Sequence, residues 1–132
     1  MSAALSLRET LTAMKAERPS WYRALLDEIA ERLRTTACEA VLRPGNKMPD
    51  FVLPNAEGEL VFSDDLLARG PLVVCFFRGG WCPFCSATLQ ALEAAVPDVT
   101  ASGASLVALT PDTSAHVLAV KRDLHLSFDV LS

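Results

Sequence analysis

The sequence predicts an α/β domain in which helices connect parallel strands, preceded by a helical segment over residues 1–41. Two observations support this fold class. The apolar runs 72–77 and 105–110 lack alternation with polar residues, which is typical of strands buried in a parallel sheet. Each run is followed by apolar residues at helical spacing, and strands that alternate with helices form parallel sheets with right-handed crossovers.

Size and composition limit the functional classes. A chain of 132 residues with 51% apolar residues is expected to form one domain with a hydrophobic core. Its net charge of −4 and the lack of a lysine and arginine cluster argue against nucleic acid as a partner. Residues 1–15 hold no apolar run long enough for a signal peptide or a membrane span, so we expect a cytoplasmic protein without a membrane partner.

The helical leader, residues 1–41, contains two predicted helices. Ser6 and Glu9 form a capping box at the start of the first, Pro19 ends it, and Ser20 is expected to cap the second. We expect the leader to pack on the domain or on a second copy in a homodimer. The second helix carries an apolar stripe: Tyr22, Leu25, Leu26, Ile29 and Leu33.

The predicted domain, residues 42–132, begins with a hairpin formed by the apolar runs 51–53 and 60–62 around a turn. Ser63 is expected to cap a short helix. The run 72–77 then predicts a central strand buried on both faces. The later elements are a helix from Cys82 that Pro97 ends or kinks, a strand at 105–110, a helix after Pro111–Thr113, and the start of a third strand at Leu126–Leu131.

Cys82 and Cys85 carry the predicted chemistry. Arg78, two glycines and Trp81 form a loop after the central strand, and Cys82-Pro83-Phe84-Cys85 opens the next helix, where Pro83 suits the first turn. Unpaired first-turn amides and the helix dipole favour a thiolate, and a CxxC at such a position can lower a cysteine pKa from about 8.5 into the range of about 3.5–7.5. The spacing also allows a disulfide, so the pair indicates redox chemistry.

These residues resemble the peroxiredoxin family, the alkyl hydroperoxide reductase and thiol-specific antioxidant group of the thioredoxin-like superfamily. The similarity lies in Asn46–Phe51, Ser63–Leu66, the segment FFRGGWCPFC and the segment ALTPD, and it covers Leu42 to the end of the chain. It is strongest to the branch that carries a CxxC. The resemblance implies a thioredoxin-like βαβ core. Such proteins continue to a hairpin and a last helix, so we expect the domain to be incomplete at its C-terminus, with either a longer chain or a partner completing it.

The resemblance and the local physics disagree about which sulfur attacks. An ungapped match to the peroxiredoxin motif Pro-x-x-x-Thr/Ser-x-x-Cys puts the attacking cysteine at Cys85, with Cys82 in place of Thr/Ser and Arg78 in place of Pro. A thioredoxin-type alignment puts it at Cys82. We expect Cys82 to be the more exposed thiol and Cys85 to be buried on an apolar stripe, where burial opposes ionisation. The prediction is therefore attack by Cys82.

Arg78, Trp81 and Pro83 are the predicted supporting residues. Arg78 beside the cysteines would stabilise a thiolate, although loop arginines are often only solvated. Trp81 either shields the thiolate and offers a partner surface or simply packs.

The alternatives to a redox pair are a structural disulfide, inert thiols and a zinc site. Zinc needs four ligands, and the remaining candidates lack paired spacing, so we expect no metal. We expect Cys75 to be a core thiol, Cys38 to have no role, and His116 and His125 to lie on the surface.

The sequence thus predicts a thiol-dependent peroxidase that reduces hydrogen peroxide or organic hydroperoxides without a cofactor. The oxidised pair would be reduced by a thioredoxin-like or glutathione-type donor. A thiol–disulfide oxidoreductase acting on protein disulfides is the second prediction. A non-catalytic binding module that dimerises through the leader is the third.

Overall fold

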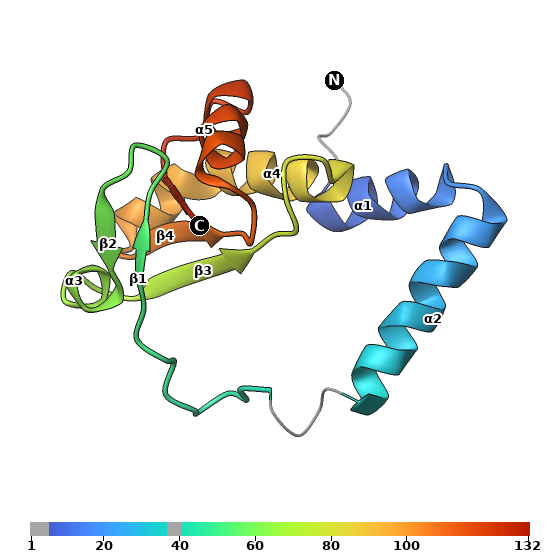
Figure 1. The fold of residues 1–132 in the computed structure, drawn as a ribbon, viewed down its shortest axis with the longest axis horizontal. Helices are drawn as coiled ribbons and strands as arrows, with labels where there is room; N and C mark the ends of the chain where they lie inside the picture. Colours follow the sequence, from blue (N-terminus) through green and yellow to red (C-terminus); the bar gives the residue numbers. More distant parts are fainter. Residues whose placement is uncertain (1–5, 37–40) are drawn as a thin grey trace. The chain divides into compact units, whose positions relative to one another are not determined.

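The computed structural model describes residues 6–36 and 41–132 (Figure 1). The chain divides into two compact units, residues 1–49 and 50–132. The predicted boundary between 41 and 42 followed the extent of the family resemblance and stays a prediction. The elements are α1 (Leu7–Ala16), α2 (Ser20–Thr36), β1 (Val52–Pro54), β2 (Leu60–Phe62), α3 (Ser63–Leu67), β3 (Leu72–Phe76), α4 (Pro83–Ala101), β4 (Ser105–Leu109), α5 (Ser114–Asp123) and β5 (Asp129–Leu131).

The capping box at the start of α1 is present as predicted. The Glu9 N–H donates to Ser6 Oγ at 3.3 Å, and the Ser6 N–H donates to Glu9 Oε2 at 2.8 Å. The Lys15 ammonium lies 2.6 Å from Asp27 Oδ1 and so links α1 to α2. This surface pair contributes at most about 1 kcal/mol.

The start of α2 differs from the prediction. Arg23 N–H donates to the Pro19 carbonyl at 3.1 Å, so Pro19 holds the N-cap position and Ser20 is the first helical residue. No residue of α2 is buried. Its exposed large apolar side chains are Trp21, Leu25, Ile29 and Leu33. None of the helices in the described part of the chain is long and apolar enough to span a membrane.

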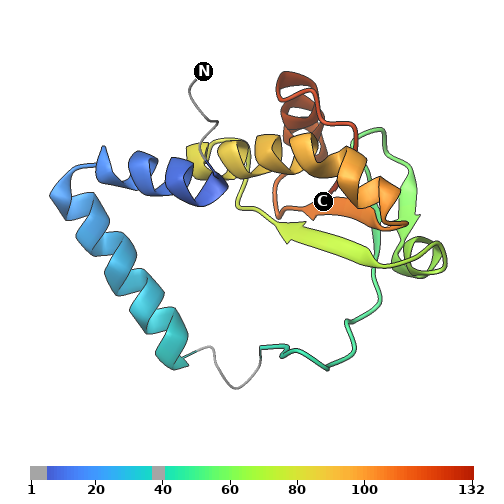
Figure 2. The same cartoon turned by 180° about the vertical axis from the view of Figure 1, so that it is seen from behind.

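The second unit is built on a parallel sheet, which confirms the predicted α/β fold class. Its three strands lie in the order β3-β4-β5, and β1 and β2 form a separate antiparallel hairpin, also as predicted (Figures 1 and 2). In the parallel register Val74 pairs with Val107, and Val107 pairs with Asp129. Because β3 and β4 are parallel neighbours, their C-terminal ends lie side by side at the same end of the sheet.

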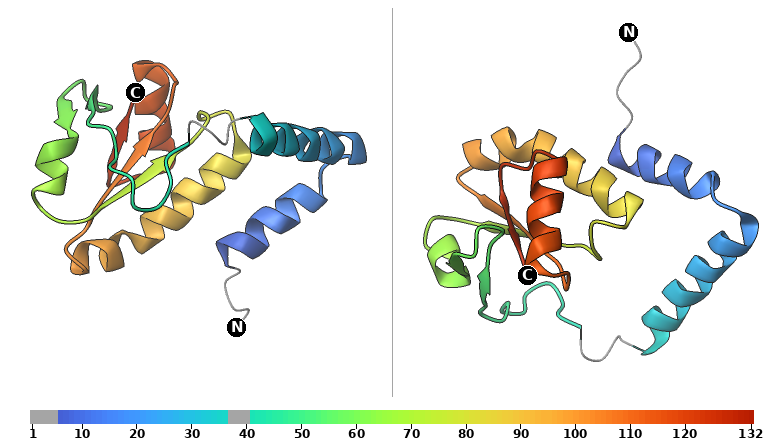
Figure 3. Two further views of the ribbon diagram at one scale, coloured as in Figure 1. Left: turned by 90° about the horizontal axis from the view of Figure 1, so that it is seen from below. Right: turned by 45° about the horizontal axis from the view of Figure 1, so that its top comes forward.

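Two hydrophobic clusters lie on the two faces of this sheet, because successive residues of β4 point to opposite sides. Helices α4 and α5 cover one face (Figure 3), and α3 with the hairpin covers the other. The predicted apolar stripe of α4 faces the first cluster. That cluster includes Leu89, Leu106, Ala108, Val117, Val120, Phe128 and Val130, with Cys85, Leu92 and Val96 packed against it, whereas the second includes Leu66, Val107, Leu109 and Leu131.

The prediction of a central strand buried on both faces is wrong for β3. Within the described residues β3 pairs only with β4, so it forms an edge of the sheet. Phe76 is 78% exposed and Val73 is 40% exposed. An apolar run shows that a strand can be buried, but its actual burial depends on the elements that cover it. The opposite edge is partly covered, because Asn55 forms an antiparallel bridge with Leu131.

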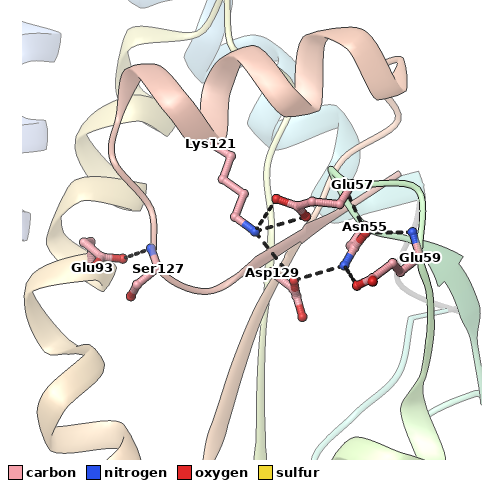
Figure 4. Close-up of polar contacts among 7 residues, drawn as sticks. All are labelled: Asn55, Glu57, Glu59, Glu93, Lys121, Ser127 and Asp129. Atoms are coloured by element: carbon pink, nitrogen blue, oxygen red, sulfur yellow. Dashed lines mark hydrogen bonds and ion pairs between the residues drawn. The ribbon is translucent and has the colours of Figure 1, made fainter.

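A polar network fastens the hairpin to α5 and β5 (Figure 4). Lys121 Nζ lies 3.0 and 3.2 Å from the two carboxylate oxygens of Glu57 and 3.8 Å from Asp129 Oδ1. Asn55 Nδ2 donates to Asp129 Oδ1 at 3.5 Å. Contacts between residues so far apart in sequence stabilise the tertiary arrangement rather than any single element.

Two helix-boundary predictions also need correction. Ser63 does not cap α3; Phe62 holds the N-cap position, and the buried Ser63 Oγ accepts a hydrogen bond from the Phe51 N–H at 2.9 Å. Of the two alternatives predicted for Pro97, the end of the helix is wrong, because α4 continues to Ala101, and the kink stays a prediction. The helix is anchored near this point, because Glu93 Oε2 accepts from the Ser127 N–H at 2.8 Å (Figure 4).

The end of α5 is closed by a residue in the left-handed region. His125 has φ 53°, its N–H donates to the Arg122 carbonyl at 3.1 Å, and the Leu126 N–H donates to the Lys121 carbonyl at 2.9 Å. This is the Schellman arrangement, in which glycine is the usual residue at the left-handed position. His125 therefore carries a steric cost that glycine would avoid.

We expect His125→Gly to raise the free energy of unfolding by about 1 kcal/mol, because it relieves this cost. His125→Ala is the matched control, since alanine keeps the Cβ and should bring no gain. Urea denaturation followed by circular dichroism measures both variants. A glycine variant no more stable than the alanine variant would contradict the prediction.

Candidate active site

The candidate site lies where the loop after β3 meets the start of α4. Cys82 is the N-cap residue of α4, with φ −94° and ψ 110°, and Pro83 occupies the first turn as predicted. The Cys82 side chain accepts a hydrogen bond from the Cys85 N–H at 3.4 Å. The sulfur thus takes the place that a hydroxyl or carboxylate oxygen usually holds at a helix start.

Arg78 contacts the same sulfur. Its Nη2 donates to Cys82 Sγ at 3.0 Å, which confirms the predicted placement of a cation beside the cysteine pair. Arg78 reaches Cys85 as well, through its backbone N–H. One residue at the end of β3 therefore contacts both thiols.

The exposure predicted for the two cysteines is wrong. Cys82, expected to be the more exposed thiol, is 0% exposed, whereas Cys85, expected to be buried, is partly exposed. The reason is the N-cap geometry, which turns the sulfur inward over the first-turn amides and under the Arg78 side chain. Sequence spacing predicted which face of the helix Cys85 joins, but not the direction of the residue just before the helix.

The surroundings of the two cysteines favour a thiolate at Cys82 rather than at Cys85. Burial by itself raises the pKa of the Cys82 thiol, but hydrogen bonds from the Cys85 thiol, the Cys85 N–H and the Arg78 guanidinium together hold that pKa below its ordinary value. Burial raises the pKa of Cys85, and its hydrogen bond to Cys82 raises it further. The site thus pairs one thiol that ionises easily with a neighbour that keeps its proton.

Trp81 stacks against the arginine rather than covering the sulfur. The Arg78 guanidinium carbon lies 5.0 Å from the centre of the Trp81 ring, and Trp81 is 69% exposed. A cation–π contact of this kind restricts the guanidinium and is worth about 0.5–1 kcal/mol at an exposed site. Trp81 therefore supports the site through Arg78.

A hollow of about 130 Å³ lies at the cysteine pair. Its lining includes Cys82, Cys85 and Arg78, which contacts both of them. Apolar side chains complete the wall, so charges inside it are less screened than in bulk water. The other lining residues are Cys75, Phe76, Phe77, Phe84 and Thr88.

The two glycines of the loop are required by close packing. Gly79 has φ +146°, and a Cβ there would lie 2.6 Å from Trp81 Nε1 and 2.9 Å from Asp112 Oδ2. A Cβ on Gly80 would lie 2.4 Å from a methyl group of Val120. The loop can follow this path only without side chains at both positions.

Asp112 is the residue that sequence reasoning missed. The sequence pattern predicts a turn at Pro111–Thr113 and includes Asp112 in the ALTPD segment of the family resemblance but gives it no role, yet the Asp112 carboxylate reaches the loop that precedes Cys82. The sequence contains one signal for this contact, because Asp112 closely follows a predicted buried strand. Parallel strands bring their C-terminal ends together, so a residue there can meet the loop that follows the neighbouring strand.

The remaining candidate residues have different places. Cys75 is a half-buried free thiol that packs against the first hydrophobic cluster and also lines the hollow at the cysteine pair. Burial raises the pKa of Cys75. His116 is exposed and hydrogen-bonds Asp112, and Cys38 lies outside the described residues. Among residues 6–36 and 41–132, no group of three histidine, cysteine or acidic side chains could hold a metal ion.

The comparison with protein families agrees with this geometry. Residues 44–132 match the model of the AhpC/TSA family. The chain belongs to that family. A candidate peroxiredoxin of Mycobacterium tuberculosis (strain H37Rv) is 30% identical over 91 residues, which are 69% of this chain and 57% of the relative. The chain therefore spans little more than half the length of that AhpC/TSA relative.

Solved structures support the thioredoxin-like fold. Peroxidoxin BcpB from Mycobacterium tuberculosis superposes with a TM-score of 0.67 and 22% identity, over 70% of this chain and 60% of that one. A structure titled as a candidate protein disulfide isomerase from Bacteroides thetaiotaomicron gives a TM-score of 0.57 and 22% identity, over 69% of this chain and 58% of that one. At such identities the likeness shows the fold alone.

We expect Arg78→Gln to raise the pKa of Cys82, since it removes a charged hydrogen bond that favours the thiolate. The folded pKa of Cys82 is depressed, so the decline of its alkylation rate with falling pH should move to higher pH in the variant. Thiolate absorbance and iodoacetamide labelling across pH measure this shift.

Arg69→Gln is the matched control, because Arg69 precedes the opposite end of β3 and carries the same charge. An equal shift in both variants would show a general charge effect and contradict the assigned contact.

Proposed function

We propose that the protein is a thiol-dependent peroxidase that reduces hydrogen peroxide or organic hydroperoxides through Cys82 and Cys85. The observation that carries this proposal is the hydrogen bond of 3.0 Å from Arg78 to the buried Cys82 sulfur, which favours a thiolate. Membership of the AhpC/TSA family supports the reaction class.

In the first step the Cys82 thiolate attacks one peroxide oxygen and the O–O bond breaks. Cys82 becomes a sulfenic acid, and the departing oxygen leaves as water or alcohol after taking a proton. Arg78, already beside the sulfur, provides a positive charge where the oxygen develops negative charge. The hollow of about 130 Å³ supports this step, because it is a small space lined by Cys82, Cys85 and Arg78.

In the second step Cys85 resolves the sulfenic acid. The Cys85 sulfur attacks the Cys82 sulfur, hydroxide leaves with the Cys85 proton as water, and a disulfide forms. The raised pKa of Cys85 suits it to act second, because a protonated thiol does not compete with the Cys82 thiolate for the peroxide. Two electrons from a thioredoxin-like or glutathione-type thiol donor then restore both thiols by exchange. Such donors are found in a reducing compartment, which agrees with the predicted cytoplasmic location.

A thiol–disulfide oxidoreductase acting on protein disulfides is the second candidate. The exposed Trp81 ring beside a CxxC favours it, because such a ring offers a contact surface for another protein. The full burial of Cys82 argues against it, because a protein disulfide must approach the attacking sulfur directly. Reduction of insulin disulfides distinguishes this activity from peroxide consumption.

Substitution of each cysteine tests the assignment. Cys82→Ser should abolish peroxide consumption and sulfenic acid formation, whereas Cys85→Ser should still form one sulfenic acid per chain but fail to turn over. Dimedone trapping with mass spectrometry reads the sulfenic acid, and Cys38→Ser serves as a cysteine-removal control. The reverse pattern would assign attack to Cys85, as the ungapped peroxiredoxin alignment does.

Mild oxidation tests the resolving step separately. One equivalent of peroxide should convert Cys82 and Cys85 into a disulfide that dithiothreitol reverses, while Cys75 remains open to alkylation after unfolding. Peptide mapping by mass spectrometry identifies the linkage. Full alkylation of both cysteines after oxidation would contradict the proposed resolution.

A further inference from the structure

Asp112 is held rigidly in the segment between β4 and α5. Its N–H donates to Thr110 Oγ1 at 3.2 Å, its Oδ1 accepts from the Thr113 N–H at 3.0 Å, and the same oxygen lies 2.6 Å from His116 Nδ1. The Asp112 side chain is only 14% exposed. These contacts leave the carboxylate little freedom to rotate, so its second oxygen has a defined direction.

That second oxygen faces the glycine turn before Cys82. Asp112 Oδ2 lies against Gly79, where an added Cβ would approach it to 2.9 Å, and the Gly80 N–H lies near enough to the carboxylate to help lower its pKa. The hydrogen bond to His116 and then the contact with Gly80 are among the contacts that lower the pKa of Asp112. The acid is thus ionised where it holds the turn.

The glycine turn is connected directly to the sulfur. The Gly79 carbonyl accepts a hydrogen bond from the Cys82 N–H at 3.2 Å, and Arg78, the residue before Gly79, donates to Cys82 Sγ at 3.0 Å. Two adjacent glycines would otherwise leave this loop with many accessible conformations. The Asp112 carboxylate lies against the turn at Gly79 and so reduces the space open to it.

We propose that Asp112 is a positioning residue for the Cys82 thiolate, acting through the Gly79–Gly80 turn. By holding this turn it keeps Arg78 and the start of α4 in contact with the sulfur. The proposal rests on the proposed function only in taking Cys82 as the reacting thiol. The proposal is tested by the pH at which the Cys82 thiol ionises. The result therefore does not depend on whether the protein consumes peroxide.

The sign of the effect separates positioning from simple charge. A nearby carboxylate disfavours a thiolate, so loss of the Asp112 charge alone would lower the pKa of Cys82 and speed its alkylation. If Asp112 instead holds the turn, its loss would loosen the contact between Arg78 and the Cys82 sulfur. The pKa of Cys82 would then rise and its alkylation would slow. The two explanations predict changes in opposite directions.

The experiment measures iodoacetamide alkylation of Cys82 from pH 5 to 9 in three variants. Asp112→Ala should slow alkylation by about threefold in the rising part of the profile, which corresponds to a rise of about half a pKa unit. Asp112→Asn retains an acceptor for Gly80 and should react at least as fast as the native protein. A second hollow, of about 260 Å³, is lined by both Asp112 and Asp123, so Asp123→Ala removes a neighbouring acid and should not slow the reaction.

An Asp112→Ala variant that reacts as fast as the native protein or faster would overturn the proposal. An Asp112→Asn or Asp123→Ala variant as slow as Asp112→Ala would do so too. If Asp112→Ala does not fold, nuclear magnetic resonance of the native chain gives a separate test. The Gly80 amide proton should shift as the Asp112 carboxyl ionises, with a midpoint below the usual range for aspartate, and a Gly80 amide insensitive to that ionisation would overturn the proposal.

Discussion

The hydrogen bond between Arg78 and Cys82 is the interaction on which the candidate site depends. It joins the end of β3 to the start of α4, and it places a positive charge 3.0 Å from a sulfur that has no contact with solvent. Burial opposes ionisation of the Cys82 thiol, and the Arg78 charge acts together with hydrogen bonds from the Cys85 thiol and the Cys85 N–H to lower its pKa. The rest of the loop can be understood as the structure that brings these two side chains together.

Several weak elements combine to hold that contact. Trp81 restricts the guanidinium from one side, and the first-turn amide of Cys85 fixes the sulfur from the other. The glycines allow the loop to pass close to Val120 and Asp112, which neighbouring elements supply. No single one of these contacts would order five loop residues against their conformational entropy, and their convergence on one turn explains how the site is preorganised.

The same arrangement gives two chemically identical thiols different properties. Cys82 and Cys85 are three residues apart, and burial opposes ionisation of both. The hydrogen bonds that favour ionisation are concentrated on Cys82, because it holds the N-cap position and faces Arg78. The hydrogen bond between the thiols then works in opposite directions, lowering one pKa and raising the other. The two cysteines therefore differ in pKa because of their positions at the start of the helix, although they are the same residue type.

The sequence by itself determined the order of strands and helices and the cysteine pair at a helix start, and it predicted Arg78 beside that pair, because these depend on short-range periodicity and spacing. Only the tertiary structure decided that Cys82 is buried, that β3 is an edge within the described residues, and that Asp112 meets the glycine turn. Each of these depends on residues that are distant in the chain and adjacent in space. Local patterns specify which elements form, whereas burial and contact are properties of their packing.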